Sequence, residues 1–355
     1  MHGGATFSSA SSVNHGSPGD VTQLPIPAPP KIIMPLAFLC RLACSLSLFC
    51  LTSLALAAPA TAYITNQGSD TVSVIDLETN RVIAEIPVGK KPVGVAVSPQ
   101  AKRVFITNVE DGSISVIDSE QHKLIAILSA GTSPVGIAAK SDGSRIYVAD
   151  WFSDRILVID SVVGKTVQAI PISKAPAGLL LSPDEALLYV ANRDSNDVAV
   201  IDTASGTTLQ RIAVGTHPFG IALSMDGKRL YAVNVWSDSV SVIDTATRKI
   251  IATVKVGNHP YCATLNADGS RLYVSDTQGD TLTVIDTTSF KSIATIDVGA
   301  TPEGVAYSAQ TGRVYVASWM ENEVTVVDAA TLKVLSHIPT GKESRAFGTF
   351  IMETR

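Results

Sequence analysis

The sequence predicts an all-β fold, a seven-bladed β-propeller of four-stranded antiparallel blades. From Ala62 onward the chain can be written in lines of 42 residues whose columns align, and the seventh line ends at Arg355. Every line contains four short runs of β-branched or alternating apolar residues, with Gly, Asp, Asn, Ser or Pro between them. Four-stranded units of this length are typical of propeller blades, because radial stacking covers both apolar faces of each sheet.

The fifth line illustrates the four strands that we expect in each blade. Its runs are "RLYAVN" (229–234), "SVSVID" (239–244), "KIIATVKV" (249–256) and "YCATLN" (261–266). No amphipathic helix fits between these runs. The periodicity therefore predicts strands joined by tight turns throughout the repeats.

Most of the repeated polar residues are explained as turn residues. The Asp at the end of each "VID" run precedes a turn in which its carboxylate can accept backbone N–H bonds. These residues are Asp76, Asp118, Asp160, Asp202, Asp244, Asp286 and Asp328. The Asp-Gly pairs at 142–143, 226–227 and 268–269 supply the positive φ of a tight hairpin.

Two further columns have structural interpretations. The small residues Gly94, Gly136, Gly178, Gly220, Cys262 and Gly304 lie where the inner strands converge, and crowding there explains them. The Asx column consists of Asn66, Asn108, Asp150, Asn192, Asn234 and Asp276. We interpret it as turn capping and not as a ring of metal ligands, because its members are spread around the propeller.

The repeated lines resemble the YVTN family of β-propeller repeats. The motif that names the family is present as "YITN" (63–66) and "FITN" (105–108), and it drifts to "YVAD", "YVAN", "YAVN", "YVSD" and "YVAS" in later lines. The similarity covers residues 62 to about 342 and includes the "VIDTATxK" and "VGxxPxG" segments. It implies an exported propeller, and some members are neighbours of periplasmic quinoprotein oxidation systems. A shared fold does not fix the function.

The resemblance also implies the order of strands within a blade. The "GIALS" type of strand lies innermost, and the "LYAVN", "VSVID" and "KIIATV" types follow outward. The chain then begins on a second strand and ends on an innermost one, "RAFGTFIM" (345–352). We expect this last strand to pair with "AYITN" (62–66), so that both termini close the ring. Ser344 replaces the usual Pro and Gly348 lies two places late, which leaves the register open.

The segment before the repeats predicts export. Residues 1–33 are rich in Gly, Ser and Pro without periodicity, which is typical of a low-complexity extension. Residues 34–57 combine Arg41, an apolar run and an Ala-x-Ala step, the form of a secretory signal peptide. An extension ahead of such a signal is unusual and favours Met34 as the translation start. We expect a mature propeller over 58–355 that is periplasmic or secreted and has no membrane anchor.

Cysteine content and charge restrict the possible functions. Three of the four cysteines lie in the signal segment, so the mature chain keeps Cys262 alone and has no internal disulfide. Removing Lys31, Arg41 and Asp20 with the first 57 residues leaves 25 basic and 31 acidic residues from the original 27 and 32. This acidic balance disfavours binding to nucleic acid phosphates.

Departures from the repeat indicate the functional face. In an antiparallel blade, the loop that enters the innermost strand and the loop between the second and third strands lie at one end, here called the top face. Aromatic and charged departures gather in these loops. The residues predicted to bind a ligand or partner are Trp151, Phe152, Arg193, His217, Phe219, Trp236, His259, Tyr261, Glu303, Trp319 and Arg345. Trp and Arg commonly anchor interfaces, although aromatic residues can also simply shield the tops of blades.

The sequence contains no clear catalytic or metal signature. His217 and His259 occupy one column in adjacent blades at the channel mouth, but without a third strong ligand they predict no metal site. We interpret Cys262 as a small buried residue, with a thiol nucleophile as the alternative. G-x-S-x-G, H-E-x-x-H, C-x-x-C and phosphate-loop motifs are missing. No cofactor is predicted.

Three functions remain as hypotheses at this point. The first is a noncatalytic exported propeller that binds an unknown envelope protein or small ligand on its top face, as an accessory to a redox or uptake pathway. The second is a lactonase or hydrolase-type enzyme that uses His217, His259 and Glu303. The third is single-stranded nucleic acid binding by stacking on Trp151, Trp236 and Trp319, which fits the aromatic residues but conflicts with the acidic balance.

Overall fold

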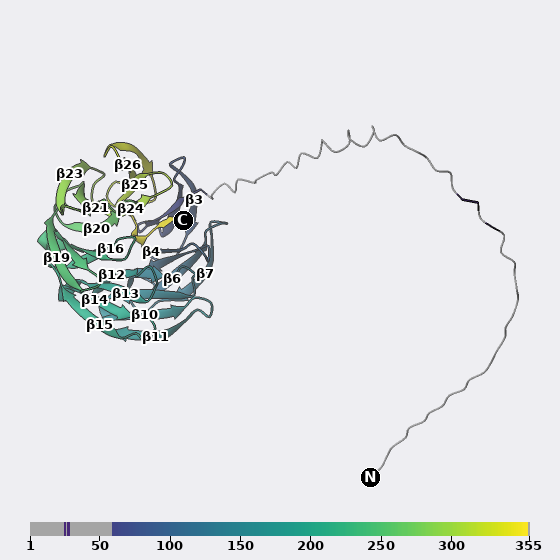
Figure 1. Ribbon diagram of the computed structural model, residues 1–355, viewed down its shortest axis with the longest axis horizontal. Helices are drawn as coiled ribbons and strands as arrows, with labels where there is room; N and C mark the ends of the chain where they lie inside the picture. Colours follow the sequence, from purple (N-terminus) through teal and green to yellow (C-terminus); the bar gives the residue numbers. More distant parts are fainter. Residues whose placement is uncertain (1–24, 26, 29–58, 354–355) are drawn as a thin grey trace, which may run out of the picture. The chain divides into compact units, whose positions relative to one another are not determined.

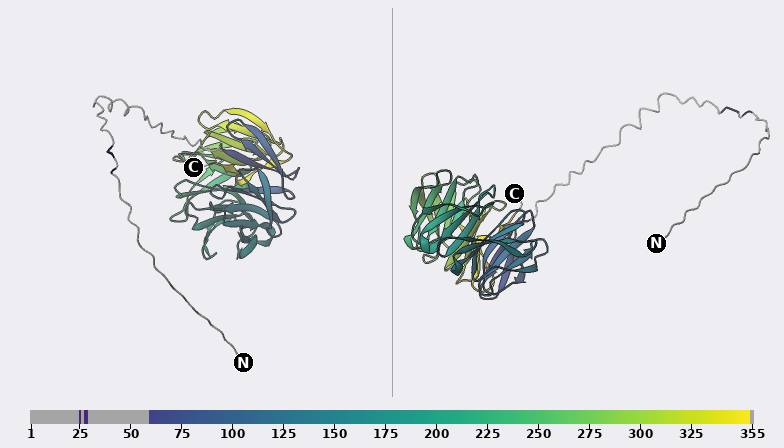
Figure 2. Two further views of the ribbon diagram at one scale, coloured as in Figure 1. Left: turned by 90° about the vertical axis from the view of Figure 1, so that its right-hand side faces the viewer. Right: turned by 90° about the horizontal axis from the view of Figure 1, so that it is seen from below.

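The computed structural model describes residues 25, 27, 28 and 59–353, and one compact unit spans Leu56–Arg355. Its strands form seven sheets, named blades A to G in chain order, which confirms the predicted seven-bladed β-propeller (Figure 1). Figure 2 shows the blades from two further sides. All of the predicted signal peptide (34–57) and all but three residues of the predicted extension (1–33) lie outside the described residues.

Each blade from B to G contributes four consecutive strands that follow one another from the axis outward, as predicted. Blades B, C and D comprise β4 (Pro92–Ser98), β5 (Arg103–Asn108), β6 (Ser113–Asp118), β7 (Lys123–Ser129), β8 (Pro134–Ala139), β9 (Arg145–Asp150), β10 (Arg155–Asp160), β11 (Lys165–Pro171), β12 (Pro176–Leu181), β13 (Leu187–Asn192), β14 (Asp197–Asp202) and β15 (Thr208–Ala213). Blades E, F and G comprise β16 (Pro218–Leu223), β17 (Arg229–Asn234), β18 (Ser239–Asp244), β19 (Lys249–Lys255), β20 (Pro260–Leu265), β21 (Arg271–Asp276), β22 (Thr281–Asp286), β23 (Lys291–Asp297), β24 (Pro302–Ser308), β25 (Arg313–Ser318), β26 (Glu323–Asp328) and β27 (Val334–Pro339).

Between residues 59 and 353, helical structure is restricted to three single turns of 3-10 helix. These are η1 (Trp151–Ser153), η2 (Arg193–Ser195) and η3 (Val235–Ser237), each in the loop between the second and third strands of blades C, D and E. Across the described part of the chain, no helix is long and apolar enough to span a membrane. The absence of amphipathic helices from the repeats is as predicted.

Blade A closes the ring with strands from both ends of the chain. It contains β1 (Thr61–Asn66), β2 (Thr71–Asp76) and β3 (Arg81–Pro87). From the C-terminus, β28 (Ser344–Arg345) and β30 (Ile351–Met352) pair antiparallel with the two ends of β1. The predicted pairing of the closing strand with β1 is therefore confirmed at both ends.

The prediction of one continuous closing strand is wrong in its middle. Between β28 and β30, the strand β29 (Phe347–Thr349) leaves blade A and pairs in parallel with β4 of blade B. Gly348 permits this departure: its φ is 116°, and an added Cβ would lie 2.4 Å from the Val95 carbonyl oxygen. In Figure 1 the yellow C-terminal segment runs to the middle of the propeller, beside β4. The closing segment thus ties blades A and B together.

The outermost strand of every blade carries a β-bulge at the same repeat position. In blade E, Val242 faces Ala252 and Ile243 faces Ile250, so Ile251 is the extra residue. Bulges twist an edge strand and interrupt its row of hydrogen-bonding groups, which hinders pairing with another chain. The bulged residues are all aliphatic and about half exposed: Ile83, Ile125, Val167, Leu209, Ile251, Ile293 and Leu335.

At one position of the repeat, the innermost strands of neighbouring blades lie so close together that glycine is favoured. At its five glycines, Gly94, Gly136, Gly178, Gly220 and Gly304, an added Cβ would lie 1.7–2.4 Å from a carbonyl oxygen of the next blade or of the closing strand. This confirms the crowding that the sequence predicted. Cys262 occupies the same column in blade F and is buried. Burial raises the pKa of its thiol, and the Glu303 charge raises it further. The inert thiol form is therefore favoured over the thiolate.

The buried core also links consecutive blades at the bottom of the propeller. One large aromatic residue per second strand, Tyr or Phe, is almost completely buried. The Tyr273 hydroxyl of blade F donates to the Ala329 carbonyl oxygen of blade G at 3.1 Å, and the Tyr315 hydroxyl of blade G donates to the Leu77 carbonyl oxygen of blade A at 3.1 Å. The predicted Asp turns lie here too: Asp244 Oδ1, for example, accepts the Thr247 N–H at 2.7 Å.

At the top, blades are joined by a hydrogen bond that we call the Asx clamp. An Asp or Asn side chain in the loop between the second and third strands accepts the backbone N–H that leads into the next blade. In blade E, Asp238 Oδ1 accepts the His259 N–H at 3.0 Å. Both residues have positive φ, 45° and 51°. The six clamps are Asp70–Lys91, Asp154–Ala175, Asn196–His217, Asp238–His259, Asp280–Thr301 and Asn322–Glu343.

The Asx column interpreted as turn capping is completely buried, and Asp150 Oδ1, for example, accepts the backbone N–H groups of Thr132 and Ser133. Its side chains bond across the blade. Asn108 Nδ2, for instance, donates to the hydroxyls of Ser113 and Ser115 at 2.9 and 3.0 Å. Within residues 59–353, no three His, Cys, Asp or Glu side chains are grouped so that they could hold a metal ion. These residues therefore pin the second and third strands together.

Two members of this column are acids with opposite surroundings. Burial opposes the ionisation of Asp150. Backbone N–H groups and the Arg155 guanidinium at 2.7 Å outweigh this effect, so the pKa of Asp150 is lowered. Asp276 has no cation partner, and its Oδ2 accepts hydroxyl hydrogens from Thr281 and Thr283. Burial raises the pKa of Asp276 to about 6. Asp276 is therefore ionised at neutral pH against an unfavourable environment.

We expect the Asx clamp to contribute measurably to stability. Asp238→Ala removes the acceptor of the His259 N–H and places Ala at a positive φ, so the free energy of unfolding should fall by about 1–3 kcal/mol. Asp238→Asn is the control, because Asn196 and Asn322 make the same clamp in blades D and G. Chemical denaturation measures both. Equal stability of the Ala and Asn variants would show that the clamp contributes little.

Asp276→Asn should stabilise the protein at neutral pH. Because the folded pKa of about 6 exceeds the ordinary value of 3.8, the wild type loses stability as pH rises from about 4 through 6, by up to about 3 kcal/mol. Asn cannot ionise, and four blades already carry it at this position. The melting temperature of the variant should exceed that of the wild type at pH 8, and the gap should shrink towards pH 4.

Asp150→Asn is the matched contrast. It breaks the contact with Arg155 in the equivalent position of blade C, so it should lower the melting temperature at neutral pH. If both Asn variants changed the melting temperature in the same direction at pH 8, the assigned difference between the two carboxyl groups would be wrong.

Candidate binding site on the top face

The two kinds of loop that sequence reasoning placed on the top face lie side by side. In blade C the Trp151 N–H donates to the Ser133 carbonyl oxygen at 3.0 Å, and in blade E the Val235 N–H donates to the His217 carbonyl oxygen at 3.0 Å. The same bond recurs around the ring. The loop between the second and third strands therefore packs on the loop that enters the innermost strand.

The backbones of His217 and His259 belong to the scaffold, because both residues are the donors of Asx clamps. Their side chains are free to vary, as the other blades show. The His217 ring packs on Trp236 with a centroid distance of 3.9 Å and an interplanar angle of 35°. Burial, followed by the nearby Arg193 charge, lowers the pKa of His217, which favours the neutral imidazole.

Aromatic residues and one cation form a continuous surface over blades C, D and E. The Arg193 guanidinium lies 5.7 Å from the ring centre of Trp151 and 5.9 Å from that of Trp236. Trp236 is 59% exposed, and Phe152, beside Trp151 on η1, is 78% exposed. We call Trp151, Phe152, Arg193, His217 and Trp236 the top-face patch. Apart from His217, its residues lie on the three 3-10 turns.

Inside the patch, one residue from each blade faces the channel mouth. This inner ring comprises Val93, Val135, Ala177, Phe219, Tyr261, Glu303 and Arg345, which are spaced by 42 residues. Phe219 stacks on Tyr261 with a centroid distance of 4.3 Å and contacts Trp151 at 5.8 Å. The ring is therefore apolar over blades B to E and polar over blades F, G and A.

Phe347 of β29 fills the centre of this ring. Its ring centroid lies 4.7 Å from that of Phe219 and 6.0 Å from that of Tyr261. β29 also contacts the innermost strands of blades B, C, D and G. Only 4% of Phe347 is exposed. The channel mouth is thus packed with aromatic side chains.

The polar half of the inner ring is a buried charged cluster. Arg345 Nη2 lies 2.6 Å from Glu303 Oε2, an ion-pair contact without an aligned hydrogen bond, and it donates to the Tyr261 hydroxyl at 3.0 Å. Arg345 Nη1 donates to Gln67 Oε1 at 3.2 Å. Burial raises the pKa of Glu303, and the Arg345 guanidinium opposes that rise. The cluster connects blades F, G and A at the ring closure.

The structure joins eight of the eleven predicted site residues in one chain of contacts. Trp151, Arg193, His217, Trp236, Phe219, Tyr261, Glu303 and Arg345 form this chain. Phe152 projects into solvent beside it. His259 and Trp319 are half-buried on the same face, and their Nδ1 and Nε1 atoms are buried without a hydrogen-bond partner. They are not part of the chain of contacts.

Sequence reasoning missed Phe347 as a residue of the channel mouth. In the repeat it occupies the column of Val305, whose members continue the innermost strand. The signal was the irregular ending itself, with Ser344 in place of Pro and Gly348 after Phe347. The irregular ending left the register of the closing strand open, but it did not predict a strand that crosses to blade B.

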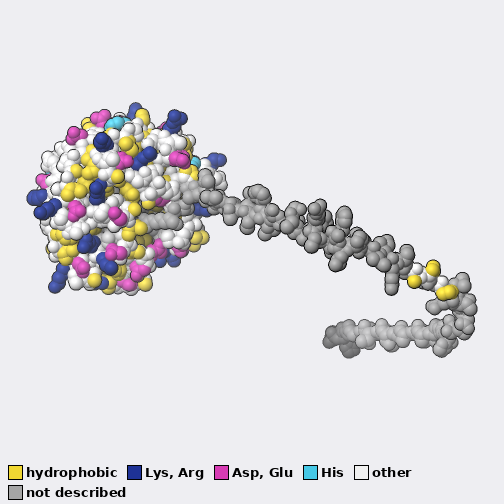
Figure 3. All heavy atoms as spheres, turned by 45° about the horizontal axis from the view of Figure 1, so that its top comes forward, with side chains coloured by type: hydrophobic (Ala, Val, Ile, Leu, Met, Phe, Trp, Pro, Cys, Tyr) yellow, Lys and Arg dark blue, Asp and Glu magenta, His cyan; other side chains and the backbone are white. Residues whose placement is uncertain are grey.

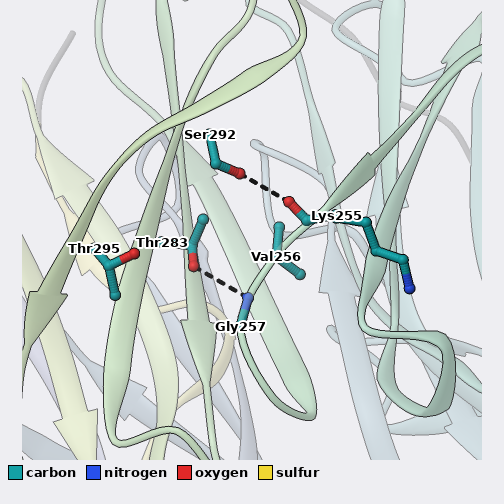
Figure 4. Close-up of a pocket in the computed structure, with 6 residues that line it drawn as sticks. All are labelled: Lys255, Val256, Gly257, Thr283, Ser292 and Thr295. Atoms are coloured by element: carbon teal, nitrogen blue, oxygen red, sulfur yellow. Dashed lines mark hydrogen bonds between the residues drawn. The ribbon is translucent and has the colours of Figure 1, made fainter.

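Two shallow grooves lie away from this site, on the outer halves of blades D, E and F. One has a volume of about 270 Å³ and is lined by Lys255, Gly257, Thr283, Ser292 and Thr295, together with Val256 (Figure 4). Within it, Ser292 Oγ donates to the Lys255 carbonyl oxygen at 2.8 Å and the Gly257 N–H donates to Thr283 Oγ1 at 3.2 Å. A similar groove lies one repeat earlier. The hydroxyl groups mainly join adjacent blades.

Comparison with known families identifies the relatives of this propeller. The model of the Cytochrome D1 heme domain family matches residues 148–261 and again residues 237–347, which together span more than half of the chain. The chain belongs to this family of β-propellers. A curated relative, PE-PGRS family protein PE_PGRS18 of Mycobacterium tuberculosis (strain ATCC 25618 / H37Rv), is 65% identical over 37 residues. That match covers 10% of this chain and 8% of the relative's length.

Solved structures support the fold. Hydrazine synthase of Kuenenia stuttgartiensis is 24% identical with a TM-score of 0.69, and the match covers 77% of this chain and 93% of that chain. The dihydro-heme d1 dehydrogenase NirN, solved in complex with DHE, is 17% identical with a TM-score of 0.63. That match covers 80% of this chain and 74% of the NirN chain. At these identities the likeness shows the fold alone.

The buried ion pair yields a prediction for the ring closure. Arg345→Met leaves the Glu303 carboxyl group buried without its cation, and loss of one partner of such a pair costs about 3–5 kcal/mol. The loss should be largest at pH 8 and smaller at pH 5, because protonation relieves a carboxyl group whose pKa is raised by burial. The double variant Glu303→Gln/Arg345→Met should recover most of the stability. Urea denaturation at both pH values measures this, and a double variant no more stable than Arg345→Met would contradict it.

Proposed function

We propose that this protein is an exported, noncatalytic propeller of the YVTN type that binds a partner protein through the top-face patch. The observation that carries the proposal is the pair of large exposed apolar side chains, Phe152 and Trp236, on loops that flank the Arg193 cation. Aromatic residues and Arg dominate binding energy at protein interfaces. The loops are fixed to a rigid frame by the Asx clamps, so little ordering is required on binding.

The packed centre favours a protein partner over a small ligand. Small-molecule sites are usually concave and enclose most of their ligand. Here Phe347 fills the axis, while the exposed apolar atoms stand on the rim. A protein surface can contact such projecting side chains without entering the channel.

The two alternative functions have weaker support. In the hydrolase hypothesis, Glu303 would act as an acid or base, but it is engaged by Arg345, and His217 packs on Trp236. In the nucleic acid hypothesis, Trp319 would continue the stacking surface, yet it makes no contact with Trp151 or Trp236 among the aromatic pairs of the described residues. Figure 3 shows acidic and basic side chains interspersed over the face in view, without a block of positive charge.

The proposal includes export of the protein and an accessory role in an envelope pathway. The signal-like segment supports export, and the repeat motifs support the YVTN type. An accessory role beside an envelope redox or uptake pathway agrees with the redox proteins among the relatives, whose names include a heme domain and a dehydrogenase.

The proposal predicts that one double substitution weakens partner binding. Residues 58–355, immobilised as wild type, should retain a partner from an envelope extract, and Phe152→Ser/Trp236→Ala should weaken its affinity by about 10-fold or more. Val162→Ser/Val163→Ser is the matched control, because these residues are 87% and 63% exposed on the opposite face of blade C. Affinities are then measured with the purified partner by calorimetry. Equal binding by the patch variant and the wild type would overturn the proposal.

A further inference from the structure

The family name of this propeller raises the question of whether its channel mouth can hold a haem. A haem in a protein needs open space for the macrocycle and usually an axial ligand from His, Cys, Met or Tyr. Its carboxylate side chains are best matched by Arg or Lys. Each requirement can be compared with the residues around the mouth.

The space on the axis is already taken by the chain itself. Phe347 is held there from both sides, by the pairing of β29 with β4 and by contact with Phe219 and Tyr261 of blades E and F. Phe219 is 7% exposed and is itself in contact with Trp151. These four aromatic rings pack on one another, so a macrocycle could enter only after Phe347 leaves.

The side chains near the mouth are poorly suited as axial ligands. His217 packs on Trp236 in a loop outside the inner ring. The Tyr261 hydroxyl accepts a hydrogen bond from Arg345, and burial favours its protonated form. The Cys262 thiol is buried against neighbouring strands. His259 lies in the loop outside the ring, with its Nδ1 buried.

The charge of the mouth also disfavours a haem. Its one inner-ring cation, Arg345, is neutralised by Glu303 at 2.6 Å. A haem carboxylate would have to displace the Glu303 carboxylate from Arg345. Two negative groups would then lie close together at the mouth. Arg193 lies further out, between two indole rings and paired with Asp194 at 2.6 Å.

We infer that this propeller has the fold of the Cytochrome D1 heme domain family but holds no tetrapyrrole at its channel mouth, because its own closing segment, Phe347–Thr349, occupies that position. The phenyl ring of Phe347 is the built-in occupant of the mouth. The partner surface is consequently displaced outward to the top-face patch, and the mouth contributes stability instead of ligand binding.

Titration with haemin tests this inference directly. The purified wild type of residues 58–355 should show no Soret band shift that saturates at one equivalent. Haemin that stacks on the exposed patch is distinguished with Phe152→Ser/Trp236→Ala, which removes that surface. Saturable one-to-one binding that survives this double substitution would place haem in the mouth and overturn the inference. Binding that disappears with it would leave the mouth closed, as inferred, and would not decide whether the patch binds a protein.

A second experiment tests the built-in occupant without haem. Phe347→Ala should lower the melting temperature and leave an apolar cavity beside Phe219 and Tyr261, and small aromatic compounds can fill such dry cavities. Saturating benzene should raise the melting temperature of this variant by several degrees and leave the wild type unchanged. Val242→Ala, on the third strand of blade E and buried in a different apolar cluster, is the control for a core truncation away from the axis. A wild-type melting temperature for Phe347→Ala would contradict the packed mouth, and so would a benzene effect on the wild type.

Discussion

The hydrogen bond between an Asx side chain and the backbone N–H that enters the next blade sets the geometry of the top face. It occurs in six of the seven blades, and both residues adopt positive φ. Asn and Asp tolerate this conformation at the acceptor end. At the donor end only the backbone is used, so the side chain is unconstrained, and Lys, Ala, His, Thr and Glu all occur there. A regular frame thereby carries variable side chains at fixed positions.

The ring itself cannot remain symmetric, because a linear chain must close it somewhere. The closure uses three short strands and places the Arg345 ion pair at the seam between blades G and A. Two residues after Arg345, the Phe347 ring contacts Phe219 of blade E and Tyr261 of blade F. The charged half of the inner ring therefore lies at the blades where the ring is closed.

Local chemistry made much of the fold predictable from sequence. Alternation and turn residues predicted the strands, and the Asp244 turn and the crowding at Gly136 follow from the repeat alone. The path of Phe347 was not predictable, because both β1 and β4 can pair with the closing segment and the choice depends on packing at the axis. The top-face position of the site residues followed from topology. Which of them touch did not, since His259 and Trp319 share the face with His217 and Trp151 but lie outside their contacts.

The split closing strand has a consequence for the order in which the molecule can form. Strand β1 is among the first parts of the propeller to be synthesised, but its inner edge is covered only by β28 and β30, about 280 residues later. Until then the edge of Tyr63 and its neighbours is open to pairing with other chains. Contacts of such large sequence separation form slowly. Completion of the ring must therefore be the last folding event, and a chain truncated before residue 344 would keep that edge exposed for its whole lifetime.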